Sequence, residues 1–294
     1  MSTSASPLEE ALLNRAWSQW VALGVDAVGE RDEGAVDPEA LIALTVELGE
    51  ADARLRDVST DWCVAFGRYV NGSRLRGVVK ELGTPRERIG ELVATVAGAG
   101  GPRWPMGTLS RPDYVARGKA RLTSATSRSR LRIRLRAAFG VNARADILAA
   151  LLSARPLEMN VADLARRTRF SKLNVSSAVD ALVLAGLLEA RLVGRERRLR
   201  LAPVDVLPGL RAPVNQPDWV AAFGVSLEVL RFLRVGNRST SVSAIEARRL
   251  VERVRSRIAA GGFPEPDLAA VGDDFNAAFD RWVAGLVDHL RRHS

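Results

Sequence analysis

The apolar residues of the first hundred positions recur every three or four residues, which is the spacing of an amphipathic helix. In residues 7–23 they occupy positions 8, 12, 13, 16, 17, 20 and 21, and residues 38–50, 53–70, 73–82 and 84–99 continue the pattern. Asp37 is placed to cap the second of these helices, because Pro38 suits a first helical position. The glycines and prolines of residues 97–105 predict a linker. We therefore expect a helical domain over residues 1–100.

Arginine alternates with serine, leucine or isoleucine from Arg128 to Arg136, inside a basic segment of residues 101–142. The alternation fits a strand with one basic and one apolar face. In a helix, Leu131, Leu135 and Phe139 would share one face at intervals of four residues. We favour the helix, because the segment runs directly into the strongly helical pattern of residues 140–154. Its arginines then lie either along the phosphates of a nucleic acid or on a solvated surface.

Residues 143–185 carry three short helical patterns separated by tight breaks. Asn142 is expected to cap the first helix, over residues 143–154, and Asn160 the second. Asp163, three residues after Asn160, completes an arrangement that resembles a capping box. A short turn at residues 168–171 follows, and the hydroxyl of Ser171 is placed to cap the third helix. This pattern predicts a helix-turn-helix.

The third helix, expected over residues 172–185, has two different faces. The inward face carries Val175, Ala178, Val179 and Leu182, and Gly186 suits the position just past the helix end. The opposite face carries Lys172, Asn174, Ser176, Ser177 and Asp180. Short hydrogen-bonding side chains of this kind suit contact with base edges in a DNA groove, and the helix N-terminus favours a phosphate.

A basic hairpin follows, with two strands near residues 188–193 and 197–201 around a turn at residues 194–196. Leu192, Leu199 and Leu201 are expected to cover the core. Five arginines crowd the hairpin and its tip: Arg191, Arg195, Arg197, Arg198 and Arg200. A loop with this charge can hold the phosphate backbone or enter the minor groove.

The segments VADLARRTRFSKLNVSSAVDALVLAGLLEA and GRERRLRL together resemble the winged helix-turn-helix domain of bacterial transcriptional regulators of the MarR and ArsR kind. The resemblance spans about residues 143–203, roughly sixty of the 294. It implies that the N-terminal half of the third helix enters the major groove and that the hairpin is a wing on the backbone. The candidate DNA-binding residues are Ser171, Lys172, Asn174, Ser176, Ser177, Arg191, Arg195, Arg197, Arg198 and Arg200.

The sequence departs from the two families in three places. Arg169 and Phe170 replace the usual small or glycine-containing turn before the third helix. The long helical regions on either side match neither family's short frame. A metal site of the ArsR kind does not transfer, because the chain has one cysteine, Cys63, and its histidines, His289 and His293, lie at the C-terminal end.

Four prolines interrupt residues 203–217 and predict a linker, after which three amphipathic patterns indicate a third, helical region. The expected fold class is mainly α, a winged helix-turn-helix with a small β-hairpin flanked by N- and C-terminal helical domains. The expected divisions are 1–100 (helical domain), 101–142 (basic linker and helix), 143–203 (winged helix), 204–217 (linker) and 218–294 (helical domain).

The positive charge is concentrated in the middle of the chain. Residues 1–100 have a net charge of −6, residues 101–212 of +14 and residues 213–294 of +1. Such a localised basic segment is typical of a polyanion binder. Lysine is rare, which a GC-rich coding sequence would explain, but that bias would not confine the excess to one segment. The DNA-facing surface is therefore expected to begin as early as Lys119.

Several kinds of chemistry find no support in the sequence. With both histidines in the C-terminal tail, Ser-His-Asp and Cys-His arrangements are not expected, and phosphate-binding glycine motifs are absent. We expect no enzyme, no cofactor and no metal. No apolar run reaches membrane-spanning length and the first residues lack the pattern of a secretory signal, so a cytoplasmic protein is expected. The six tryptophans lie outside the winged helix and serve either core packing or an aromatic-lined effector pocket.

The leading hypothesis is a sequence-specific regulator of transcription that binds double-stranded DNA as a homodimer. The dimer is inferred from the amphipathic flanking helices and from the two-fold symmetry of such regulators on palindromic sites. An alternative is an interaction or antitoxin-like subunit, whose acidic N-terminal domain docks a partner protein and whose winged helix only autoregulates or docks.

Overall fold

The computed structural model describes residues 7–27, 32, 34–106, 114–122, 127–153, 158–203, 216–235, 240–269 and 273–292. Contacts between Cα atoms divide the chain into two units. The larger is Gln19–Gln216, and the smaller joins Met1–Ser18 to Pro217–Ser294. Most of the expected linker, residues 204–215, lies outside the described residues, as do Ala154 and His293. The division into five predicted domains stays a prediction.

The larger unit begins with helices, as the apolar spacing predicts. They are the end of α1 (Pro7–Ala22), α2 (Pro38–Leu48), α3 (Ala53–Phe66), the 3-10 turn η1 (Gly67–Tyr69), α4 (Gly72–Leu82) and α5 (Arg86–Gly98). The carboxylate of Asp37 accepts a hydrogen bond from the Ala40 amide (3.2 Å), and Pro38 is the first helical residue, which confirms the predicted start of α2.

Two tryptophans form the centre of this helical part. Trp20 and Trp62 are fully buried, with ring centroids 5.4 Å apart. Trp20 Nε1 donates to Thr45 Oγ1 (2.8 Å) and Trp62 Nε1 donates to the Leu23 carbonyl (3.1 Å), so neither indole leaves an unmade hydrogen bond in the core. Core packing is thus the role of these two tryptophans.

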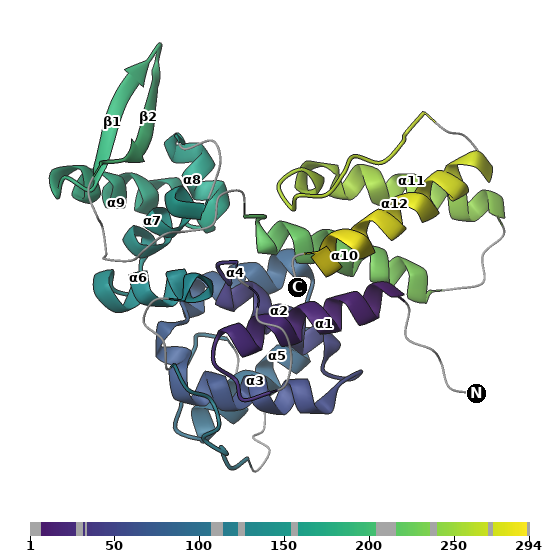
Figure 1. Ribbon diagram of the computed structural model, residues 1–294, viewed down its shortest axis with the longest axis horizontal. Helices are drawn as coiled ribbons and strands as arrows, with labels where there is room; N and C mark the ends of the chain where they lie inside the picture. Colours follow the sequence, from purple (N-terminus) through teal and green to yellow (C-terminus); the bar gives the residue numbers. More distant parts are fainter. Residues whose placement is uncertain are drawn as a thin grey trace. The chain divides into compact units, whose positions relative to one another are not determined.

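The larger unit continues with helix α6 and a winged helix, which is formed by α7, α8, α9 and a hairpin (Figure 1). The elements of this part are η2 (Arg128–Arg130), α6 (Leu131–Phe139), α7 (Ala143–Ser153), α8 (Val161–Thr168), α9 (Lys172–Leu184), β1 (Leu188–Val193) and β2 (Glu196–Leu201). The strands pair antiparallel from Leu188↔Leu201 to Val193↔Glu196, and Met159 pairs with Leu199 on the other edge of β2. The fold is mainly α with one small hairpin, as the sequence predicts.

One apolar core joins α6 to the winged helix. Leu131 and Leu135 of α6 are fully buried in the same cluster as Leu148 of α7, Val179 of α9 and Leu199 of β2. The segment is a helix, which confirms the choice made between helix and strand. The spacing of four residues places both α6 leucines on the side that faces this core.

The hairpin differs from the prediction at one leucine. Leu199 is fully buried and Leu201 packs partly against the core, but Leu192 is 76% exposed, so the prediction that it covers the core is wrong. Leu192 pairs with Arg197 near the tip of a ribbon that extends away from α7 and α9 (Figure 1), where no core remains to be covered. The turn is Gly194-Arg195, with Gly194 at a φ of 61°.

The smaller unit consists of the first part of α1 with α10 (Trp219–Arg234), α11 (Thr240–Ile258) and α12 (Asp273–Arg292). α11 packs against both α10 and α12, and Phe223, Val251 and Leu286 lie fully buried in this unit. Asp218 caps α10 by accepting from the Val220 amide (3.1 Å). No helix among the described residues is long and apolar enough to cross a membrane.

Candidate nucleic-acid interface

Local side-chain caps fix where the two helices of the helix-turn-helix begin. Asn160 accepts from the Asp163 amide (2.8 Å) and Asp163 accepts from the Asn160 amide (3.4 Å), which confirms the capping box at the start of α8. Ser171 Oγ accepts from the Asn174 amide (3.2 Å) and confirms the predicted cap of α9. These bonds satisfy amides that no helix turn would otherwise satisfy.

The turn between α8 and α9 is held by an arginine in a conformation that favours glycine. Arg169 ends α8 with a φ of 60° and is the one residue other than glycine with positive φ in the described chain. A left-handed residue with a Cβ costs roughly 1 kcal/mol. The hydrogen bonds of the Arg169 guanidinium offset this cost. It donates to both carboxylate oxygens of Glu81 in α4 (3.0 and 3.2 Å) and to the Arg167 carbonyl (3.2 Å).

The outward face of α9 carries most of the predicted base-reading side chains. Lys172, Asn174 and Ser177 are exposed and Ser176 is half-buried, while Val175, Ala178, Val179 and Leu182 are buried as predicted. The helix therefore presents its polar N-terminal half to solvent.

Sequence reasoning missed one residue of this face. Leu173 is 79% exposed and lies in the first turn of α9. Helical spacing would have revealed it, because Leu173 stands four residues before Ser177 and seven before Asp180, on the side opposite the buried stripe. An apolar side chain in a reading position can contact the methyl group of thymine.

The wing arginines lie at the surface, and four of the five have a carboxylate partner. The pairs are Arg191–Glu158 (2.7 Å), Arg197–Asp180 (2.6 Å), Arg198–Glu196 (2.7 Å) and Arg200–Glu189 (2.6 Å). Within the described part of the chain Arg195, at the turn, has no such partner and is exposed. Exposed pairs of this kind contribute about 0–1 kcal/mol each, so a phosphate can replace the carboxylate.

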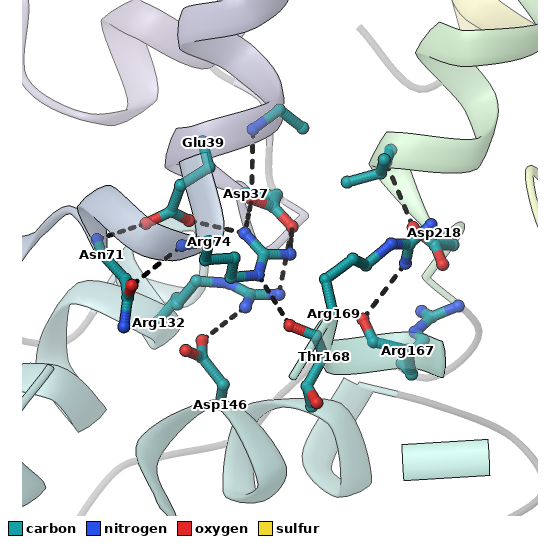
Figure 2. Close-up of polar contacts among 12 residues, drawn as sticks. Asp37, Glu39, Asn71, Arg74, Arg132, Asp146, Arg167, Thr168, Arg169 and Asp218 are labelled. Atoms are coloured by element: carbon teal, nitrogen blue, oxygen red, sulfur yellow. Dashed lines mark hydrogen bonds and ion pairs between the residues drawn. The ribbon is translucent and has the colours of Figure 1, made fainter. Parts of the chain in front are cut away.

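A buried set of six charged residues lies beneath this surface and joins the N-terminal helices to the winged helix. Its members are Asp37, Glu39, Arg74, Arg132, Arg136 and Asp146, and we call it the ion network. The Arg74 guanidinium bonds Asp37 (2.6 and 2.7 Å) and Glu39 (2.6 Å), and its Nε donates to the Thr168 carbonyl (2.9 Å) at the end of α8 (Figure 2).

The second half of the ion network is formed by α6. Arg136 is fully buried and donates to Glu39 (2.6 and 3.1 Å), to Asp146 (3.0 Å twice) and to the Tyr69 carbonyl (2.8 Å). Arg132 pairs with Asp146 and, at 3.3 Å, with Asp37. These two arginines lie neither along phosphates nor on a solvated face, so both expectations for them are wrong. The carboxylates that attract them inward are Asp146, which follows on α7, and Asp37 and Glu39, which lie far away in the sequence.

The ion network lowers the pKa of two of its carboxylates, Asp37 and Asp146. Burial alone would raise the pKa of Asp146, but Arg136 and Arg132 outweigh it and hold that pKa below its ordinary value. The pKa of Asp37 lies well below its ordinary value, because Arg132 and Arg74 likewise outweigh its burial. Both groups are therefore charged in the folded protein at neutral pH.

Acid should unfold this unit through these two carboxylates. A carboxyl whose pKa is lower in the folded state contributes stability that is complete above its unfolded pKa, about 3.9, and is lost as pH falls through the folded pKa. We expect the urea midpoint of unfolding to fall steadily below about pH 5, and Asp146→Asn to flatten that fall. The exposed Asp180→Asn is the control and should keep the wild-type pH dependence. If the urea midpoint of Asp146→Asn falls with pH as steeply as that of the wild type, Asp146 is not a source of the acid sensitivity.

The described residues offer no group of three or more His, Cys, Asp or Glu side chains that could hold a metal ion. Cys63 is buried, and burial raises the pKa of its thiol.

The arrangement of α7, α8, α9 and the hairpin defines a winged helix-turn-helix. Residues 142–199 match the model of the MarR family, and this segment is therefore a MarR-type winged helix, a unit of DNA-binding transcription regulators. The match covers about a fifth of the chain. No curated protein and no solved structure matches the chain.

Proposed function

We infer that this protein is a sequence-specific regulator of transcription that binds double-stranded DNA. The observation that supports it best is that one MarR-type segment presents two features on its surface: a polar, exposed first half of α9 and a hairpin with five arginines. One feature suits base edges in the major groove and the other suits phosphates. Neither is explained by the packing of the core.

The proposed roles follow from the exposure of each side chain. Lys172, Asn174, Ser176 and Ser177 contact bases or the phosphates beside them, while Ser171 places the helix N-terminus toward a phosphate. Arg191, Arg195, Arg197, Arg198 and Arg200 hold the backbone. When DNA binds, its phosphates replace the carboxylates as partners of the arginines that are paired in the free protein.

The regulator is proposed to act as a homodimer. Two winged helices related by a two-fold axis read two half-sites about one helical turn apart, which is about 10 base pairs. The bound sequence should then be an inverted repeat. The homodimer is inferred from the two-fold symmetry usual in this class of regulators and from the amphipathic helices that flank the winged helix.

Recovery of bound genomic fragments, followed by a footprint, tests the proposal. We expect a small set of enriched fragments that share an inverted repeat, bound at least about 10³-fold more tightly than unrelated duplex. Asn174→Ala combined with Ser177→Ala should remove the enrichment and leave unspecific binding in place. Fragments recovered without any shared sequence would overturn the specific regulator. If, in addition, another protein co-purifies in stoichiometric amount, the docking alternative is favoured, in which the acidic N-terminal helices bind that partner.

Leu173 should read a thymine within the footprinted site. Deoxyuridine in place of that thymine removes only the methyl group, so we expect about fivefold weaker binding, the effect of roughly one buried methyl. Leu173→Ala should make binding insensitive to the exchange. Leu184→Ala is the matched control, since Leu184 is 91% exposed at the far end of the same helix. A thymine effect that survives in Leu173→Ala would rule this contact out.

A further inference from the structure

The helical part before the winged helix has an excess of negative charge, but one stretch of it is basic. Residues 1–70 carry five Lys or Arg and thirteen Asp or Glu, whereas residues 71–90, with α4 and the start of α5, carry five and two. In this stretch Arg74 belongs to the ion network and Arg88 pairs with Glu50 (2.5 Å). The other three cations are exposed, and in the described part of the chain they have no ion-pair partner: Arg76, Lys80 and Arg86. We call these three the α4–α5 patch.

The side chains of the α4–α5 patch surround one open hollow between the two helices. Glu87 is the one carboxylate among the described residues that line this hollow. The side chains beside the cations of α4 are small, since Ser73 and Gly77 occupy the same exposed face as Arg76 and Lys80. Three cations on a surface of this kind give a local positive potential that a row of phosphates can approach closely.

The helix that carries most of the patch is attached to the turn before the recognition helix. Arg74 Nε donates to the Thr168 carbonyl (2.9 Å, Figure 2), and Glu81 accepts two hydrogen bonds from the Arg169 guanidinium (3.0 and 3.2 Å). Arg74 is in turn fixed by the ion network, and Lys80 is the direct neighbour of Glu81. The position of the patch relative to the start of α9 is therefore set within the folded protein, so that no backbone has to be ordered when a ligand binds.

This attachment brings the α4–α5 patch close to the groove that α9 is proposed to enter. The major groove is about 12 Å wide and is bordered on both sides by phosphates. Because α4 is one side chain away from the turn that leads into α9, the strand that borders the groove would pass near the exposed face of α4. Lys172, the exposed first residue of α9, continues the positive charge toward the groove. The wing follows the opposite end of α9.

We propose that Arg76, Lys80 and Arg86 bind the phosphate backbone beside the bases that α9 contacts. The DNA-binding surface then extends beyond the MarR-type segment, which begins at residue 142, into the N-terminal helices. This inference rests on the proposed function and adds to it a second set of backbone contacts. It explains why exposed cations without partners occur next to the turn before α9, in a part of the chain that is otherwise acidic.

The salt dependence of DNA binding by the full chain tests the patch. Arg76→Gln, Lys80→Gln and Arg86→Gln are combined in one variant, which should unfold at the wild-type urea midpoint because all three side chains are exposed. Each lost phosphate contact reduces the slope of log K against log salt by about 0.9. We therefore expect a slope shallower by about 2.7 and roughly 10²-fold weaker binding at about 0.15 M salt. The ratio of specific to unspecific affinity should stay the same, because these contacts read no bases.

A second triple variant separates phosphate contact from net charge. Arg54→Gln, Arg56→Gln and Arg68→Gln remove the same amount of positive charge from exposed positions of α3 and η1, and together they should keep the wild-type slope. If the two triple variants have equal slopes, the three cations of the patch make no contact of their own, and the proposal is overturned.

Phosphate ethylation interference on the footprinted duplex locates the contacts. Some ethylated phosphates should block the wild type and no longer affect the patch variant, because the contact they disturb is already lost. The variant with Arg195, Arg197 and Arg198 replaced by alanine should remain sensitive to these phosphates and become insensitive to a different set. The same interference pattern in the wild type and the patch variant would overturn the patch and leave the proposed function standing. A wild-type protein that binds no duplex would overturn both.

Discussion

Replacing Arg136 with methionine is expected to lower the free energy of unfolding by about 3–5 kcal/mol. The variant leaves Glu39 and Asp146 buried while their shared cation is lost, and it removes the donor to the Tyr69 carbonyl. Arg74 and Arg132 remain, so the ion network then holds three carboxylates against two arginines. A buried negative charge left uncompensated in this way costs more than a pair itself contributes. Urea unfolding followed by circular dichroism at neutral pH measures the loss.

Arg128→Met is the matched control for this experiment. Arg128 belongs to the same basic segment but is exposed, so its replacement should change the free energy of unfolding by less than about 0.5 kcal/mol. Adding Glu39→Gln to Arg136→Met should cost less than the two single losses combined, since residues in one network couple by about 0.5–3 kcal/mol. If Arg136→Met proves as mild as Arg128→Met, the ion network does not hold the unit together.

The elements that the sequence predicted best are those held by contacts within a few residues. The caps by Asp37, Asn160 and Ser171 each join a side chain to an amide three residues away, so the pattern that predicts them lies in one short window. Helical spacing likewise placed the buried stripe of α9. The choice of helix for residues 131–139 succeeded because four-residue spacing and the neighbouring helix agreed.

The ion network could not be predicted, because its partners are far apart in the sequence. Arg136 and Glu39 are separated by 97 positions, and Arg74 and Thr168 by 94. Composition alone counts every arginine of the middle segment as available to DNA, whereas Arg132 and Arg136 neutralise carboxylates inside the protein. The same pairing uses part of the acidic excess of the first hundred residues, which reduces the charge available for an outside partner.

The predicted DNA-facing surface, which was expected to begin near Lys119, is interrupted because some arginines of this segment are buried. Lys119 is exposed, but Arg130 and Arg136 are buried, so the basic surface is not continuous along the segment. Arg117, Lys119, Arg121 and Arg128 are exposed before these buried arginines, as are Arg191, Arg195 and Arg200 of the wing after them. Exposure of a side chain depends on the packing of the whole unit, which no local pattern contains.

Replacing Arg195, Arg197 and Arg198 together with alanine should weaken binding to every duplex and reduce its salt dependence. Each phosphate contact adds about 0.9 to the slope of log K against log salt, so the slope should become shallower by about 2.7. Counterion release alone then predicts roughly 10²-fold weaker binding at about 0.15 M salt. The ratio of specific to unspecific affinity should change little, because these contacts position the protein and do not read bases. Fluorescence anisotropy at several salt concentrations measures all three quantities.

Asp180→Asn supplies the opposite change at the same site. Its carboxylate, on α9, pairs with Arg197 at 2.6 Å and is 62% exposed. Neutralising it frees the arginine for phosphate and removes a negative charge from the DNA-facing side, so we expect severalfold tighter binding to all duplexes. In the background of Arg197→Ala the same substitution should have a smaller effect, because part of the gain acts through that arginine. Arg56→Ala, at an exposed position of α3, should leave affinity and slope unchanged. A triple variant that keeps the wild-type salt slope would show that the wing does not contact phosphates, whatever α9 does.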